Sequence, residues 1–164
     1  MRDIVLTLVF AGLLPFALKY TWAGVLLWTW FSLMNPHRLA WGFASNMPFA
    51  LVIAIVTLIS LPFNMKKIRM PADATAVFII LFVGWVCITT MNAFFVTGST
   101  NDLITVLKIQ LMTLVAILAL RERKHIEAFI AVIVVSVGFY GFKGGLFTIA
   151  SGGSARVWGP GGTY

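Results

Sequence analysis

Hydrophobic residues occur along the chain in six long runs, which are separated by short polar or proline-containing breaks. The runs lie at about residues 4–18, 20–34, 47–63, 75–95, 103–120 and 126–142. A helix that crosses the hydrocarbon core of a bilayer needs about 20 apolar residues, within a range near 17–25. The last four runs reach that length at their core or with their flanks. The pattern therefore predicts an all-α, polytopic transmembrane helical bundle of about six helices.

The first two runs nearly touch, with Lys19 between them. They form either a tight hairpin or one long tilted helix over 4–34, which would leave five helices. The single helix would place Lys19 near the middle of the membrane, at a cost of about 2.5–3.5 kcal/mol on insertion scales. The hairpin avoids this cost, and we prefer it.

The basic residues of the breaks predict an orientation. In a six-helix alternation, one side holds seven cations, namely Lys19, Lys66, Lys67, Arg69, Arg121, Arg123 and Lys124. The other side holds four, namely Arg2, Arg38, Lys143 and Arg156. The positive-inside rule makes the seven-cation side cytoplasmic. We expect one transmembrane domain over 1–150, followed by a glycine-rich loop over 151–164 that faces outward, as do the breaks "NPHRLAWG" and "TGSTND".

Composition agrees with a membrane protein, because 60% of the 164 residues are hydrophobic and 10% are charged. A soluble domain is about half apolar and a quarter charged. The net charge of +7 could indicate a nucleic-acid binder, but no basic face with interleaved aromatics exists outside the apolar runs. Trp22 is one of five tryptophans near expected interfaces, where amphipathic rings are favoured. We therefore expect membrane lipids as partners and no nucleic acid.

Catalytic and metal-binding motifs are nearly absent from the sequence. Cys87 stands alone in an apolar run, and His37 and His125 sit in breaks among cations without a ligand-spaced partner. The acidic residues all lie at expected helix ends, where they complement helix dipoles or are solvated; they are Asp3, Asp73, Asp102, Glu122 and Glu127. The residues alone predict no catalytic group, no metal and no cofactor.

Three cations allow both a plain and a functional interpretation. Lys108 lies about one and a half turns into the fifth expected helix, where it either snorkels to the outer interface or faces a cavity that holds an anion. Arg38 belongs either to an interfacial turn or to a contact with a headgroup phosphate. Arg156, among glycines, is either a surface charge or a guanidinium whose donors fork around phosphate oxygens.

The stretch "GFYGFKGG" places four glycines where the sixth helix is expected to end, namely Gly138, Gly141, Gly144 and Gly145. Small residues at this spacing let helices approach closely, which is the interpretation we favour. The alternative is a helix break that exposes backbone N–H groups beside Lys143 and so favours an anion.

Three stretches together carry a resemblance to a known family: "SLMNPHRLAWGFA" (32–44), "VLKIQLMT" (106–113) and "GFYGFKGGLFTIASGG…RVWGPGG" (138–162). They closely resemble the N-terminal region of the O-glycosylation ligases associated with exosortase A systems. These ligases belong to the O-antigen ligase/polymerase superfamily of glycosyltransferases. The resemblance implies a multi-pass protein of the bacterial inner membrane that acts in polysaccharide biosynthesis. It would transfer a glycan from a lipid-pyrophosphate carrier of the polyprenyl type to a periplasmic acceptor, without nucleotide sugar or metal.

In that superfamily, a periplasmic arginine ahead of a glycine-rich stretch is assigned to the pyrophosphate of the carrier, and Arg156 matches it. The leaving pyrophosphate develops negative charge that fixed cations stabilise. Our hypothesis is that Arg156, Lys143, Lys108 and Arg38 converge on one outward-facing cavity that binds the substrate.

The resemblance has one departure, because family members continue into further helices and a large periplasmic loop with a functional histidine. Neither His37 nor His125 matches that histidine. The resemblance thus implies that this chain is the front part of such an enzyme, incomplete relative to the family. The alternative is a non-catalytic structural transmembrane subunit that packs against other membrane subunits in a larger complex.

Overall fold

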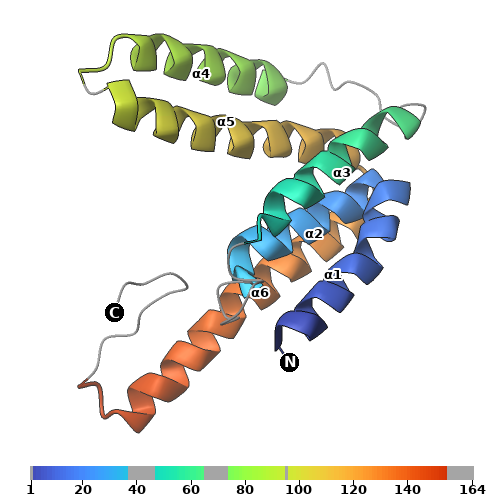
Figure 1. The fold of residues 1–164 in the computed structure, drawn as a ribbon, viewed down its shortest axis with the longest axis vertical. Helices are drawn as coiled ribbons and strands as arrows, with labels where there is room; N and C mark the ends of the chain where they lie inside the picture. The colour runs from blue at the N-terminus through green and yellow to red at the C-terminus, as the bar shows by residue number, and fades with distance from the viewer. Residues whose placement is uncertain (1, 37–46, 65–73, 95, 155–164) are drawn as a thin grey trace.

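The computed structural model describes residues 2–36, 47–64, 74–94 and 96–154. These residues form six α-helices and no strand, so the expected all-α fold is confirmed (Figure 1). In chain order the helices are α1 (Arg2–Lys19), α2 (Thr21–Met34), α3 (Phe49–Phe63), α4 (Ala74–Met91), α5 (Val96–Ala119) and α6 (Arg123–Ala150).

The first two runs form a hairpin, as preferred from the sequence. Tyr20 separates α1 from α2 and has an extended backbone, with φ −129° and ψ 112°. Helix α2 runs back alongside α1 (Figure 1). Lys19 consequently lies at the turn and not in the middle of a long helix.

Helices α1, α2 and α3 share a hydrophobic core. Its buried residues are Phe10, Ala17, Leu27, Phe31, Phe49 and Ile53. The Phe10 ring meets the rings of Phe31 and Phe49 edge-on, with centroids 5.6 and 4.7 Å apart. Such edge-to-face pairs add to the free energy gained by burying the rings. The three aromatic side chains therefore hold the three helices together at one level.

The seam between α2 and α3 is built from small and hydroxyl-bearing residues. A Cβ atom at Gly24 would lie 2.3 Å from Thr57 Oγ1, so the two backbones approach closely there. One turn further along, the Ser60 hydroxyl donates to Thr21 Oγ1 over 3.1 Å, and Thr57 and Ser60 are both fully buried. Small residues and interhelical hydroxyl bonds are the usual means of joining helices where water is scarce.

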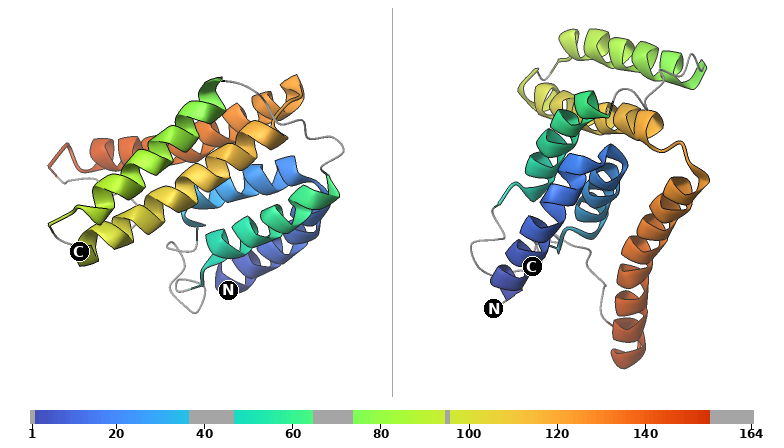
Figure 2. Two further views of the ribbon diagram at one scale, coloured as in Figure 1. Left: turned by 90° about the horizontal axis from the view of Figure 1, so that it is seen from above. Right: turned by 90° about the vertical axis from the view of Figure 1, so that its right-hand side faces the viewer.

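Helices α4 and α5 form an arm that runs across the direction of α1, α2, α3 and α6 (Figures 1 and 2). The two helices lie side by side, and α4 has no buried residue. A membrane-spanning helix usually tilts by no more than about 40° from the bilayer normal. The arm and α6 are not parallel in this structure, which therefore does not show six helices that cross a membrane together (Figures 1 and 2). The alternation of six crossings stays a prediction.

Three helices in the described part of the chain are long and apolar enough to cross a membrane: α4, α5 over Gly98–Ala119, and α6. This agrees with the membrane class that composition indicates. The run 47–63 was expected to reach the same length, but α3 has 15 residues. Its rise of about 22 Å is less than the hydrocarbon thickness of about 30 Å. The helix begins only at Phe49, because Pro48 within the run is its N-cap, and it ends with the run at Phe63, followed by the C-cap Asn64.

Helices α5 and α6 extend beyond the runs predicted for them. The stretch "TGSTND" at 97–102, expected as a loop, lies in the first turns of α5. Helix α6 continues through Gly138, Gly141 and Gly145 to Ala150, so the end expected at 142 is wrong, and so is the alternative of a helix break at these glycines. A glycine costs a helix about 1 kcal/mol relative to alanine. Leaving backbone groups unpaired in an apolar environment costs several kcal/mol each, so the helix continues.

Helix α6 ends where its glycines are needed for a turn. Gly152 and Gly153 have φ of 60° and 76°, in the left-handed region. The Gly153 amide donates to the Thr148 carbonyl over 3.0 Å, which caps the last turn. Glycine takes up this conformation without the steric cost of a Cβ atom.

Candidate functional site

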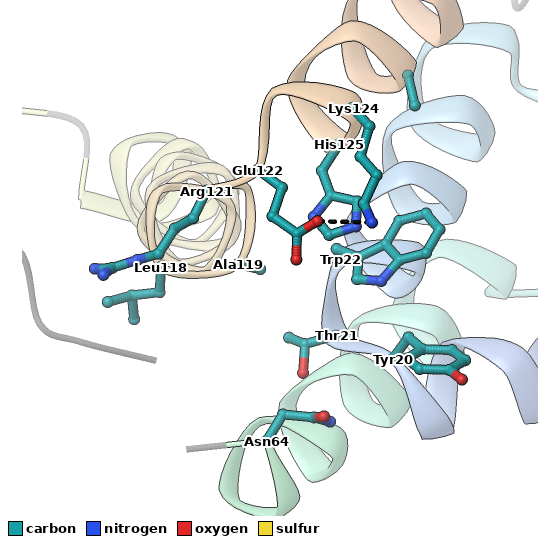
Figure 3. Close-up of a pocket in the computed structure, with 11 residues that line it drawn as sticks. Tyr20, Thr21, Trp22, Asn64, Leu118, Ala119, Arg121, Glu122, Lys124 and His125 are labelled. Atoms are coloured by element: carbon teal, nitrogen blue, oxygen red, sulfur yellow. Dashed lines mark ion pairs between the residues drawn. The ribbon is translucent and has the colours of Figure 1, made fainter. Parts of the chain in front are cut away.

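A pocket of about 570 Å³ lies where several helix ends meet. The α1–α2 turn, the end of α3, the end of α5 and the start of α6 contribute to it (Figure 3). Its polar and aromatic lining includes Tyr20, Trp22, Asn64, Arg121, Lys124 and His125. The pocket therefore gathers residues from the breaks that the loop charges assign to the seven-cation side.

The rings of Trp22 and His125 stack at the centre of this site. Their centroids are 4.4 Å apart, and the planes differ by 15°. Trp22 is in the first turn of α2 and His125 in the first turn of α6, so the stack joins two helices at their starts. The Phe16 ring meets the Trp22 ring edge-on, with centroids 5.8 Å apart. The Nδ1 atom of His125 is covered and has no hydrogen-bond partner among the described residues.

Charged side chains at the start of α6 form exposed ion pairs. Lys124 Nζ lies 2.7 Å from Glu122 Oε2, and Arg123 Nε lies 2.7 Å from Glu127 Oε1. The two side chains of the first pair are 73% and 60% exposed. Exposed pairs of this kind contribute about 0–1 kcal/mol, because solvent screens them. Lys124 can therefore exchange its partner for another anion at little cost.

Asn64 fixes the end of α3 against the α1–α2 turn. Its Nδ2 atom donates to the Lys19 carbonyl over 3.2 Å and to the Ser60 carbonyl over 2.9 Å. Both bonds satisfy acceptors at helix C-termini that have no partner within their own helix. Asn64 is therefore a structural part of the pocket wall.

The structure does not bring together the two expected substrate-binding cations that it describes. Lys108 is exposed on α5, and Lys143 is exposed on α6. Measured along the helix axes from the α5–α6 corner, Lys108 is about 16 Å away and Lys143 about 30 Å away, and the two helices diverge (Figure 1). Arg38 and Arg156 lie outside the described residues, so the convergence of all four stays a prediction.

The sequence pattern missed the pairing of Trp22 with His125. It assigns Trp22 to a membrane interface and His125 to a break without a partner. The signal that could have found the pair is the helix alternation itself, which places the breaks at 19–20 and 121–125 on the same side. Only the packing of α2 against α6 shows that these two breaks adjoin.

The described chain is all-α, and three of its helices are apolar and long enough to span a membrane. These features indicate an all-α membrane protein, with an aromatic, cationic pocket at one end of its packed helices. Over residues 1–157 the chain matches the model of DUF5935, a family of unknown function, and it belongs to that family. No curated protein and no solved structure matches the chain. The match includes all six helices, and the family description assigns no activity.

Proposed function

We propose that the chain is the N-terminal membrane part of a glycan ligase or polymerase of the O-antigen ligase type. It helps to move a glycan from a polyprenyl pyrophosphate carrier to an acceptor at the periplasmic face of the bacterial inner membrane. The resemblance of residues 32–44, 106–113 and 138–162 supports this proposal. The second stretch lies on α5, and the third begins on α6.

The continuity of α6 is the observation that carries the proposal furthest. The helix has 28 residues and therefore a length of about 42 Å. Arg123 and Lys124 begin it, and Lys143 lies about 30 Å further along, which is close to the thickness of the hydrocarbon core. A membrane-crossing α6 with its basic end in the cytoplasm therefore carries Lys143 to the outer interface. This favours an outward position for the segment that contains Arg156.

The chemistry of the transfer explains what these cations do in the proposal. The bond between the glycan and the pyrophosphate breaks, and the leaving pyrophosphate gains negative charge. Cations held in a site of low dielectric constant stabilise that charge. Arg156 contributes a planar guanidinium that suits two phosphate oxygens, and Lys143 contributes a compact charge. In the proposal Arg38 adds a further cation, and Lys108, on α5, joins them only when the α4–α5 arm lies alongside α6 in the working enzyme.

The first prediction tests Arg156 in the natural full-length protein, reconstituted into proteoliposomes with a polyprenyl-pyrophosphate-linked glycan donor. We expect Arg156→Gln to lower the rate of glycan transfer by about 10²–10³-fold, the effect of removing one preorganised charge donor. Arg156→Lys should retain part of the rate. Arg69→Gln, with the same change of charge on the expected cytoplasmic side, is the matched control. Equal rates for Arg156→Gln and Arg69→Gln would contradict the pyrophosphate role.

A structural subunit is the second candidate function, and the α6 surface favours it. At Gly138, Gly141 and Gly145, a Cβ atom would meet no atom within 4 Å. These glycines therefore pack against nothing in the described chain, although small residues at such spacing let another helix approach closely. Helix α4, which has no buried residue, is equally open.

A further inference from the structure

Two hollows adjoin along α2, α5 and α6. The pocket of about 570 Å³ is the first, and the second is a groove of about 300 Å³ between the same three helices. On α2 the lining passes from Trp22 to Val25, on α5 from Ala119 to Ala116, and on α6 from His125 to Phe129. Each step is three or four residues, about one helical turn, and stays on one face of its helix. The polar pocket therefore continues into the groove.

We propose that this pair of hollows binds an anionic glycerophospholipid, with the phosphate in the pocket and an acyl chain in the groove. The site lies at the basic end of α6, whereas Lys143 lies toward its other end. The inference is thus separate from the proposed function and stands without it.

Charge favours an anionic headgroup over a zwitterionic one. Arg121 and Lys124 line the pocket with one carboxylate, that of Glu122. Lys19 does not line the pocket but adjoins a residue that does, because its Nζ lies 5.3 Å from the centre of the Tyr20 ring. The Lys124–Glu122 pair is exposed to solvent, so a phosphate oxygen can share or replace the carboxylate as the partner of Lys124. Cations outnumber acids here, and a lipid with net negative charge satisfies the excess.

The change in polarity between the two hollows favours a lipid over a soluble phosphate. Tyr20 and Trp22 mark the level of the headgroups, where amphipathic rings are stable. One turn deeper, the groove is lined by Val25, Trp28, Met112 and Phe129. A ligand that fills both hollows must be anionic at one end and apolar at the other.

The experiment measures lipid binding to the full chain by native mass spectrometry in a neutral detergent. The probes are phosphatidylglycerol, phosphatidylethanolamine and phosphatidylcholine with identical acyl chains. We expect phosphatidylglycerol to bind about tenfold more tightly than either other lipid, the effect of one additional charge-assisted hydrogen bond. Equal binding of the three lipids would overturn the proposal.

Two neighbouring cations give a matched pair of variants. Lys124→Gln should weaken phosphatidylglycerol binding by about tenfold. Arg123→Gln should change it by no more than about twofold, because only long-range attraction is altered. Arg123 lies in the same turn and also pairs with a carboxylate, but it does not line the pocket. Equal losses in both variants would mean that the basic turn attracts lipid without a pocket, and would overturn the proposal.

Two threonines of α5 test the groove. Thr113 lines it and Thr105 does not, and both hydroxyls donate to the carbonyl four residues earlier. Thr113→Phe should fill the groove and weaken phosphatidylglycerol binding, whereas Thr105→Phe should leave it unchanged. Far-ultraviolet circular dichroism shows whether each variant has folded. If Lys124→Gln has not folded, Arg121→Gln replaces it, because Arg121 also lines the pocket. Displacement of the lipid by inorganic phosphate, with no effect of Thr113→Phe, would assign the pocket to a soluble anion and overturn the lipid assignment.

Discussion

At the scale of single residues, Gly24 is a position in the described chain where the close packing requires the absence of a side chain. The methyl group of an alanine there would lie 2.3 Å from Thr57 Oγ1 and 2.9 Å from Thr57 Cγ2. Thr57 cannot turn away easily, because it is fully buried and its hydroxyl donates to the Ile53 carbonyl over 2.7 Å. An extra methyl group must therefore push α2 and α3 apart.

We predict that Gly24→Ala lowers the free energy of unfolding by about 1–3 kcal/mol, as overpacking of a tight core does. Thermal unfolding of the purified chain in detergent measures the change. Gly84→Ala on α4 is the matched control, because the new methyl group meets no atom within 4 Å. It should raise the stability of the helix by up to about 1 kcal/mol. A melting temperature of Gly24→Ala equal to that of Gly84→Ala would contradict the close seam between α2 and α3.

At the scale of the helices, the sequence predicts most of the fold because membrane helices are recognised by length and apolar content. The run 20–34 and α2, which covers Thr21–Met34, differ by a single residue. The errors fall where polar or small residues belong to a helix. In α5 the Thr105 hydroxyl, just beyond "TGSTND", donates to the Asn101 carbonyl within that stretch, so a polar side chain can satisfy its hydroxyl group inside the helix. A hydrophobicity pattern cannot distinguish such a stretch from a loop.

The candidate site was less predictable than the helices. Lys108 and Lys143 could be singled out as charges within apolar runs, but their spacing along the chain says nothing about how α5 and α6 diverge. The pocket depends on the meeting of the α1–α2 turn with the start of α6, as the Trp22–His125 stack shows. That contact follows from tertiary packing, and no local pattern encodes it.

Helix α6 offers a test between the two candidate functions, because its glycine face is open. We predict that leucines at Gly138, Gly141 and Gly145 leave the chain folded, since a Cβ atom at each position meets no atom within 4 Å. If the face packs against other helices, the leucines should abolish the assembled complex on native gels by preventing close approach. Leucine at Gly84, which is also open, is the control. Loss of the complex in a chain that binds no glycan donor even before the substitutions would favour the structural subunit over the ligase.

At the scale of the whole molecule, the described chain consists of a packed part and an arm. Helices α1, α2 and α3 share the core, and α6 packs along α2. The Tyr140 hydroxyl donates to the Met34 carbonyl and ties α6 to the end of α2. Helix α5 reaches the packed part mainly through α2, and α4 contacts chiefly α5. The orientation of the packed part in the membrane therefore depends on α6, the longest of the six helices.

The last prediction concerns that orientation. Cys87 is the only cysteine of the chain, so Cys87→Ser provides a background for single cysteines at Arg123 and Ser154, on either side of α6. At about 42 Å, the helix is long enough to place these two positions at opposite interfaces. Basic residues at its start are expected to stay in the cytoplasm. We therefore expect a membrane-impermeant maleimide to label Ser154→Cys in intact spheroplasts, and Arg123→Cys only after permeabilisation. Labelling of both from one side would show that α6 does not cross the membrane as a single span, and the outward position of Arg156 would fall with it.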